Sequence, residues 1–114
     1  MSATELDPNA KPVGFTTDRL AAIDLAKEIG KLDGHVLRAS RTRIAPGGGY
    51  AAHIHDGRPE IIVMLSGTLT ETRDGKAAEH TTGSVLVMHD NVVHTLQNRG
   101  AVDVEYVSIT VRIP

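Results

Sequence analysis

The sequence GGGYAAHIHDGRPEIIVMLSG, at residues 47–67, places a His-x-His pair and a glutamate between glycine-marked turns. Side chains two positions apart on a β-strand point to the same face, so His53 and His55 lie together if this segment is a strand. Glu60 follows an Asp-Gly-Arg-Pro turn and begins the next strand. A hairpin then places Glu60 beside the two histidines.

A second stretch, GSVLVMHDNVVHTLQN at residues 83–98, adds a third histidine. His94 begins a strand directly after a turn at Asp90-Asn91. Histidines and one carboxylate that converge inside a barrel form a site for a divalent transition metal. Imidazole suits iron, manganese, nickel, zinc and copper, and a carboxylate adds a hard oxygen. Taken alone, the same residues also fit surface or hydrogen-bonded histidines and a solvated glutamate.

Short alternating segments separated by turn residues predict an all-β domain. Pro-Gly-Gly-Gly at residues 46–49 predicts a turn, and Asp74-Gly75 is a strong hairpin signal. Strands with turns roughly every six to ten residues predict an antiparallel sandwich or barrel. The expected strands cover residues 35–44, 50–55, 60–65, 68–73, 76–81, 84–88, 92–98 and 102–113.

The N-terminal part of the chain is organised differently. Residues 1–30 are expected to form an arm that is ordered only where it docks, and residues 31–114 the barrel domain. Residues 17–31 fit both a strand and a helix. The alternation of Ala21, Ile23 and Leu25 favours the extended form over the helical face that Leu20, Ile23, Ala26 and Ile29 approximate. Such a strand can cover an exposed sheet edge, so we expect a homodimer.

Composition narrows the class of protein. The chain has 114 residues, enough for one domain, and no cysteine, which excludes disulfides, zinc–thiolate sites and iron–sulfur clusters. A net charge of -2, with two tyrosines, one phenylalanine and no tryptophan, argues against a nucleic-acid partner or a membrane surface. No long apolar run or signal-peptide pattern is present, so we expect a cytoplasmic protein.

The two stretches resemble the two motifs of the cupin superfamily, in order and about fifteen residues apart. The resemblance implies a small single-domain cupin, an antiparallel jelly-roll barrel or double-stranded β-helix, that binds one divalent transition metal ion. Carried over residue by residue, the family's ligands fall on His53, His55, Glu60 and His94. The second turn reads His89-Asp90-Asn91 in place of the usual Pro-x-Gly. Because asparagine tolerates the left-handed conformation, the turn survives.

Further residues are candidates for a substrate pocket. Arg58 either meets an anionic substrate at the barrel mouth or is a solvated turn residue. His89 is either an exposed turn residue or a group that moves a proton near the metal. Tyr50 lies three positions before His53, on the opposite face of an ideal strand, and is left outside the site. The apolar wall of the pocket is expected from Ile62, Met64 and Leu96, which share parity with the ligands.

The leading hypothesis is a metal-dependent enzyme, dioxygenase-like or an isomerase or lyase, that acts on a small organic molecule in the barrel. By analogy with the family, the first reaction to consider is oxygenative cleavage of a chelating enol or diketone-like substrate. Glu60 then acts as a metal ligand and, if it detaches, as a base. Two alternatives remain: a non-catalytic module that binds a sugar or another small molecule, and a structural dimer whose metal is incidental. Cupins also commonly form dimers by packing sheets or exchanging N-terminal strands, and Ala21, Ile23 and Leu25 are the candidates here.

Overall fold

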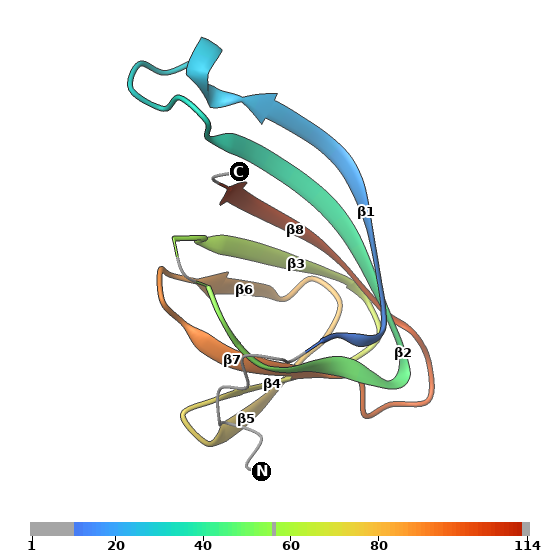
Figure 1. Cartoon of the computed structure of the whole chain (residues 1–114). Helices are drawn as coiled ribbons and strands as arrows, with labels where there is room; N and C mark the ends of the chain where they lie inside the picture. The colour runs from blue at the N-terminus through green and yellow to red at the C-terminus, as the bar shows by residue number, and fades with distance from the viewer. Residues whose placement is uncertain (1–10, 56, 113–114) are drawn as a thin grey trace.

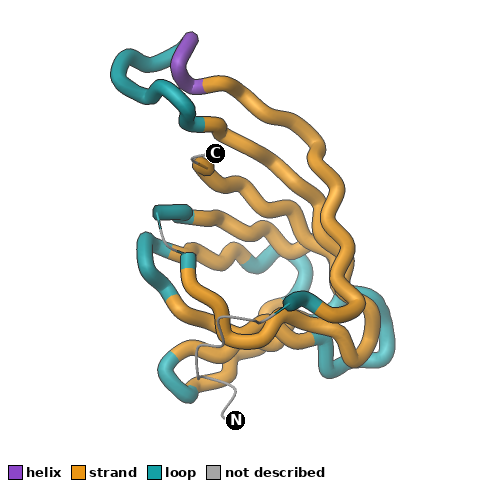
Figure 2. The backbone as a smooth tube through the Cα atoms, viewed as in Figure 1, coloured by secondary structure: helices purple, strands orange, loops and turns teal. Residues whose placement is uncertain are grey.

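Alternation of buried and exposed residues runs along most strands of the computed structural model, which describes residues 11–55 and 57–112. In β3, for example, Ile62 and Met64 point inward while Ile61 and Leu65 face outward. The strands, which dominate Figure 2, are β1 (Val13–Asp24), β2 (Val36–Ile54), β3 (Glu60–Ser66), β4 (Leu69–Arg73), β5 (Lys76–His80), β6 (Val85–Met88), β7 (Val93–Gln97) and β8 (Val104–Arg112).

The strands form one antiparallel sheet in the order β5-β4-β7-β2-β8-β3-β6, with β1 paired to β2. The sheet curls into a nearly closed barrel (Figure 1), which confirms the predicted all-β jelly-roll class. Its core consists of aliphatic side chains with one tyrosine, Tyr106. No described helix has the length and hydropathy of a membrane span.

Strand β2 is a single bent strand, and the prediction of two strands separated by a turn at residues 46–49 is wrong. Its first half pairs with β1 and β8, and its second half pairs with β7. Gly47 has φ 81°, so the chain bends there without reversing. At Gly49, a side chain would collide with the backbone of Leu96 on β7. The glycines therefore let one strand pass from one side of the barrel to the other.

Residues 17–24 take the extended form that the alternation favoured, as part of β1, whereas Leu25 lies in the turn that follows. β1 pairs antiparallel with β2 of the same chain, from Phe15 opposite Ile44 to Asp24 opposite Val36. A short 3-10 turn, η1 (Leu25–Lys27), follows, and the carboxylate of Asp24 accepts a hydrogen bond from its backbone. The first ten residues of the expected arm lie outside the described part of the chain.

Two turns have the expected backbone. Asp74 and Gly75 have φ 50° and 75°, as a two-residue hairpin between β4 and β5 requires. Asn91 has φ 65°, the left-handed conformation expected for the second turn. The backbone of Asn91 donates to the carbonyl of His55, and His55 donates to Val92. The second turn is therefore tied to the end of β2, where the histidine pair lies.

Candidate metal centre

Strand pairing brings the three histidines together. His53 on β2 lies directly opposite His94 on β7. His55 follows two positions later and faces the same way. The Nε2 atom of His94 lies 3.0 Å from Nε2 of His55 and 3.0 Å from Nε2 of His53. The described residues that can supply a shared metal ion with three ligand atoms are these histidines.

The other ring nitrogen of each histidine faces an oxygen. Nδ1 of His53 lies 2.9 Å from the carbonyl of Ala51, and Nδ1 of His55 lies 3.2 Å from the carbonyl of Arg58. Nδ1 of His94 lies 2.7 Å from a carboxylate oxygen of Glu71. A carbonyl or carboxylate oxygen can only accept, so each Nδ1 carries the proton and each Nε2 presents a lone pair. Three converging lone pairs repel one another until a cation lies between them.

Burial keeps two of these imidazoles neutral. Burial first, and then the neighbouring His94, lower the pKa of His53 to about 3 and that of His55 to about 4. A neutral imidazole is the form that binds a metal ion. At neutral pH, His53 and His55 are therefore neutral and each can bind a metal ion through Nε2.

Glu71 on β4 is a partner of the site that the sequence analysis did not identify. Its carboxylate accepts the short hydrogen bond from His94 and a second, 2.9 Å long, from Nε of Arg73. Burial alone would raise the pKa of Glu71, but the hydrogen bonds from His94 and Arg73 outweigh it and lower the pKa. The ionised carboxylate holds His94 in one tautomer and orientation. Only the pairing of β4 with β7 brings it there.

Glu60 lies at the start of β3 and close to His55, as expected, but the expected hairpin with the histidine strand is wrong, because β8 lies between β2 and β3 in the sheet. Its Oε1 is 3.8 Å from Nε2 of His55, and its Oε2 accepts a hydrogen bond from the hydroxyl of Ser108. Burial raises the pKa of Glu60, although the Ser108 hydrogen bond and nearby positive charges oppose the rise. The carboxylate stands next to the three-nitrogen cluster and is not one of its three members.

His53 and His55 line a cavity of about 160 Å³, called here the histidine cavity. Tyr50 lines it and stacks on His53, with ring centroids 3.9 Å apart. The sequence analysis left Tyr50 out on parity. A register shift between Tyr50 and His53 relative to β7 breaks that parity, because Tyr50 pairs with Leu96 and His53 with His94. Arg58 also lines the cavity and donates from its guanidinium to the carbonyl of Ile54.

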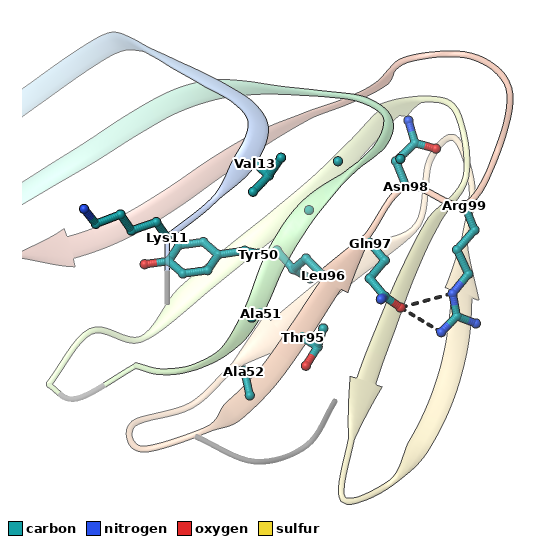
Figure 3. Close-up of a pocket in the computed structure, with 13 residues that line it drawn as sticks. Lys11, Val13, Tyr50, Ala51, Ala52, Thr95, Leu96, Gln97, Asn98 and Arg99 are labelled. Atoms are coloured by element: carbon teal, nitrogen blue, oxygen red, sulfur yellow. Dashed lines mark hydrogen bonds between the residues drawn. The ribbon is translucent and has the colours of Figure 1, made fainter. Parts of the chain in front are cut away.

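The other expected pocket residues lie elsewhere. Ile62 and Met64 are buried in the hydrophobic core and do not line the histidine cavity. Leu96 belongs to the core and also borders a larger cavity of about 420 Å³ (Figure 3). That cavity lies against the glycine-rich bend of β2 and contains none of the histidines. His89 is exposed and borders an outer groove beside β6 and β8.

The donor set fits a divalent transition metal. Two imidazole nitrogens about 2.1 Å from one ion and at a right angle to each other are separated by about 3.0 Å. His94 Nε2 lies at this distance from the Nε2 atoms of both His53 and His55. Nitrogen donors with a nearby carboxylate suit iron, manganese, nickel, zinc or copper. His53, His55 and His94 would hold the ion, with Glu60 adjacent.

Comparison with known proteins agrees with this architecture. Residues 40–110 match the family model of the Cupin domain, and no curated protein matches the chain. A predicted oxalate decarboxylase from Thermotoga maritima is similar in structure, with 20% identity, a TM-score of 0.68, and coverage of 89% of this chain and 90% of that chain.

Two further structures are similar. KdgF from Halomonas sp. has 14% identity and a TM-score of 0.70 over 86% of this chain and 78% of that chain. The Cupin_2 domain of an XRE family transcriptional regulator from Enterobacter cloacae has 17% identity and a TM-score of 0.61 over 86% and 96%. At these identities the likeness concerns the fold alone. With most of the barrel matched by the family model, the chain belongs to the cupin-domain family.

Proposed function

We propose that this cupin is a metal-dependent enzyme that acts on a small organic molecule bound in the barrel. One observation carries the proposal: three Nε2 atoms converge, and all three Nδ1 atoms are held by oxygen acceptors. A site with its tautomers set from outside is preorganised for a cation. Histidines with a purely structural role would not need three separate acceptors to turn their Nε2 lone pairs toward one point.

Glu60 is the proposed fourth ligand or base. Its Oε1 stands 3.8 Å from His55 Nε2, within reach of the same ion or of a substrate proton beside it. The Ser108 hydroxyl holds the other carboxylate oxygen in place. Burial raises the pKa of Glu60, which suits a group that accepts and returns a proton. A bound divalent ion supplies Lewis-acid polarisation of a substrate oxygen.

The reaction classes that this residue set supports are dioxygenase-like chemistry and isomerase or lyase chemistry. Both need an oxygen-bearing substrate held next to a carboxylate that moves a proton. Tyr50, stacked on His53, forms one wall and keeps water from that side of the ring. Cleavage of a chelating enol is the first reaction to assay. No step is assigned to His89, which is exposed on the outer face.

A non-catalytic module that binds a sugar or another small molecule is the second candidate. The cavity lined by His53 and His55 is also lined by the hydroxyl residues Ser40, Thr42 and Ser108, which can hydrogen-bond a polar ligand without turnover. A fold neighbour is the cupin domain of a transcriptional regulator. Such a module does not require a metal, so metal content separates the two candidates.

The deciding experiment is elemental analysis of untagged protein purified without added metal. We expect close to one equivalent of a single transition metal. His53→Ala should lower the metal content sharply while the circular dichroism spectrum stays that of a β-protein. His35→Ala, a histidine outside the cluster, is the matched control and should retain the metal. Full occupancy in His53→Ala, or no metal in wild-type protein after reconstitution, would contradict the proposal.

We also propose a homodimer. β1 pairs with β2 on one side, and no other described strand pairs with it. Its outer residues include the apolar Leu20 and Ile23, which are 54% and 46% exposed. Leu25, the third residue of the expected dimer strand, is buried against its own chain. The exposed edge and apolar side chains of β1 are therefore the surface offered to a second copy.

A further inference from the structure

Three arginines line the histidine cavity. Arg38 on β2, Arg58 in the turn before β3 and Arg112 at the end of β8 all line it. Val36 pairs with Arg112, and Arg38 pairs with Thr110 two positions earlier on β8, so the two arginines lie on the same face of neighbouring strands. The glycine bend is far along β2 from this point, so the cluster belongs to the histidine cavity and not to the larger one.

The charges of this cluster are not balanced within the cavity. Among the described residues that line it, the single acidic one is Glu60, which is already hydrogen-bonded to Ser108. Nε of Arg38 is buried and has no hydrogen-bond partner. Desolvation and the charges of Arg112, Arg19 and Arg58 lower the pKa of Arg38. A buried guanidinium N–H without an acceptor is costly, and like charges held together repel.

We propose that this arginine cluster binds a carboxylate group of the substrate, so that the cavity takes a small organic anion with at least one carboxylate. The inference rests on the proposed function, since it names the substrate class of the same site. A planar guanidinium donates two parallel hydrogen bonds to a carboxylate, which would satisfy the free Nε of Arg38 and offset the repulsion from Arg58 and Arg112.

The size of the cavity limits the anion. Its volume of about 160 Å³ corresponds to about five water molecules at roughly 30 Å³ each. That is room for a short-chain carboxylate and too little for a nucleotide or a sugar phosphate. Hydroxyl groups of Thr17, Ser40 and Thr42 line the same cavity and can bond the rest of a polar molecule. A short dicarboxylate or oxo-acid, with one end at the arginines and the other toward the histidines, fits this arrangement.

Isothermal titration calorimetry tests the inference, with malonate as the probe and uncharged malonamide as its analogue. Both are titrated into protein as purified and into chelator-treated protein. Malonate should bind more tightly than malonamide. Arg38→Gln and Arg112→Gln should each weaken malonate binding about ten- to a hundredfold, whereas Arg41→Gln should leave it unchanged. Arg41 is the matched control because it is exposed on the opposite face of β2.

Two further measurements keep a failure interpretable. Arg38→Lys retains the charge and loses the planar fork, so it should recover only part of the affinity. Thermal melts and metal analysis of every variant test whether the fold and the metal site persist. Malonate binding that is absent, or that is equal in Arg38→Gln, Arg112→Gln and Arg41→Gln, overturns the inference even if the metal is present. Arginine-dependent binding by wild-type protein that holds no metal even after reconstitution sustains the inference and contradicts the metal-enzyme proposal instead.

Discussion

Glu71 shows how one side chain outside the cluster of ring nitrogens can control it. Its carboxylate lies 2.7 Å from Nδ1 of His94 and is nearly buried. A negative acceptor makes the opposite nitrogen a better donor to a metal. Glu71→Gln keeps an oxygen acceptor but removes the charge, so we expect metal affinity to fall about tenfold or more. Competition with a fluorescent chelator measures this. The control Glu79→Gln, at an exposed position on β5, should bind the metal as wild type does. Equal metal affinities of Glu71→Gln and wild type would contradict the role of Glu71.

The histidines also set how metal-free protein responds to acid. In the fold the pKa of His53 is lowered to about 3 and that of His55 to about 4, whereas an unfolded histidine titrates near 6.5. Between these values the unfolded chain binds more protons, so stability is fully present above pH 6.5 and declines as pH falls toward 4. We expect the chelator-treated protein to melt at a lower temperature at pH 5 than at pH 7.5.

Glu60 acts in the opposite direction, because its pKa is raised and protonation favours the folded state. The variant His53→Asn isolates the histidine contribution, since it removes a titrating group and keeps the polar shape. Its melting temperature should depend less on pH over the same range. If the melting temperatures of wild type and His53→Asn fall equally between pH 7.5 and 5, His53 does not contribute to the acid sensitivity.

The turn between β3 and β4 contains a glycine that a larger residue could not replace without moving the neighbouring backbone. Gly67 has φ 78°, and a Cβ there would meet the carbonyl of Asp103 at 2.5 Å. Gly83 has φ 86° but faces open space. Gly83→Ala should therefore cost only the conformational strain, about 1–2 kcal/mol. Gly67→Ala should cost about 1–3 kcal/mol more, because the backbone before β8 must move.

Urea denaturation of both variants measures the difference in the free energy of unfolding. Equal losses for Gly67→Ala and Gly83→Ala would show that the loop before β8 yields without cost. Since β8 carries Ser108 and Arg112, a shift of its start should also weaken malonate binding in Gly67→Ala. Strand β8 therefore both closes the barrel and supplies residues to the site.

In the whole molecule, the ribbon of β1 and β2 extends away from the rest of the barrel (Figure 1), and the longest dimension is 44 Å. Its apolar outer residues are the proposed dimer surface. Size-exclusion chromatography with light scattering should give about twice the chain mass of 12.2 kDa. Leu20→Glu with Ile23→Glu should shift it to the monomer, whereas Val102→Glu, exposed in the loop before β8, should not. A wild-type mass of one chain would exclude the dimer.

Local spacing was enough to predict much of this protein. Period-two alternation, the Asp74-Gly75 hairpin and the left-handed Asn91 follow from the conformational preferences of short segments. The His-x-His pair shares a face for the same reason, and the spacing of the two motifs led to the cupin family. Ile62 and Met64 were correctly placed inside, but parity does not distinguish a core from a pocket wall.

The tertiary structure decided what joins the histidines. Glu71 reaches His94 only because β4 pairs with β7, and Tyr50 stacks on His53 only because a register shift in β2 reverses the parity. The arginines meet because β8 returns beside β2. Such contacts depend on which strands pair and in what register, which is the outcome of burying the whole core at once. The sequence pattern determines which face of its strand each residue occupies. The pairing of strands in the closed barrel determines which residues of other strands lie next to it.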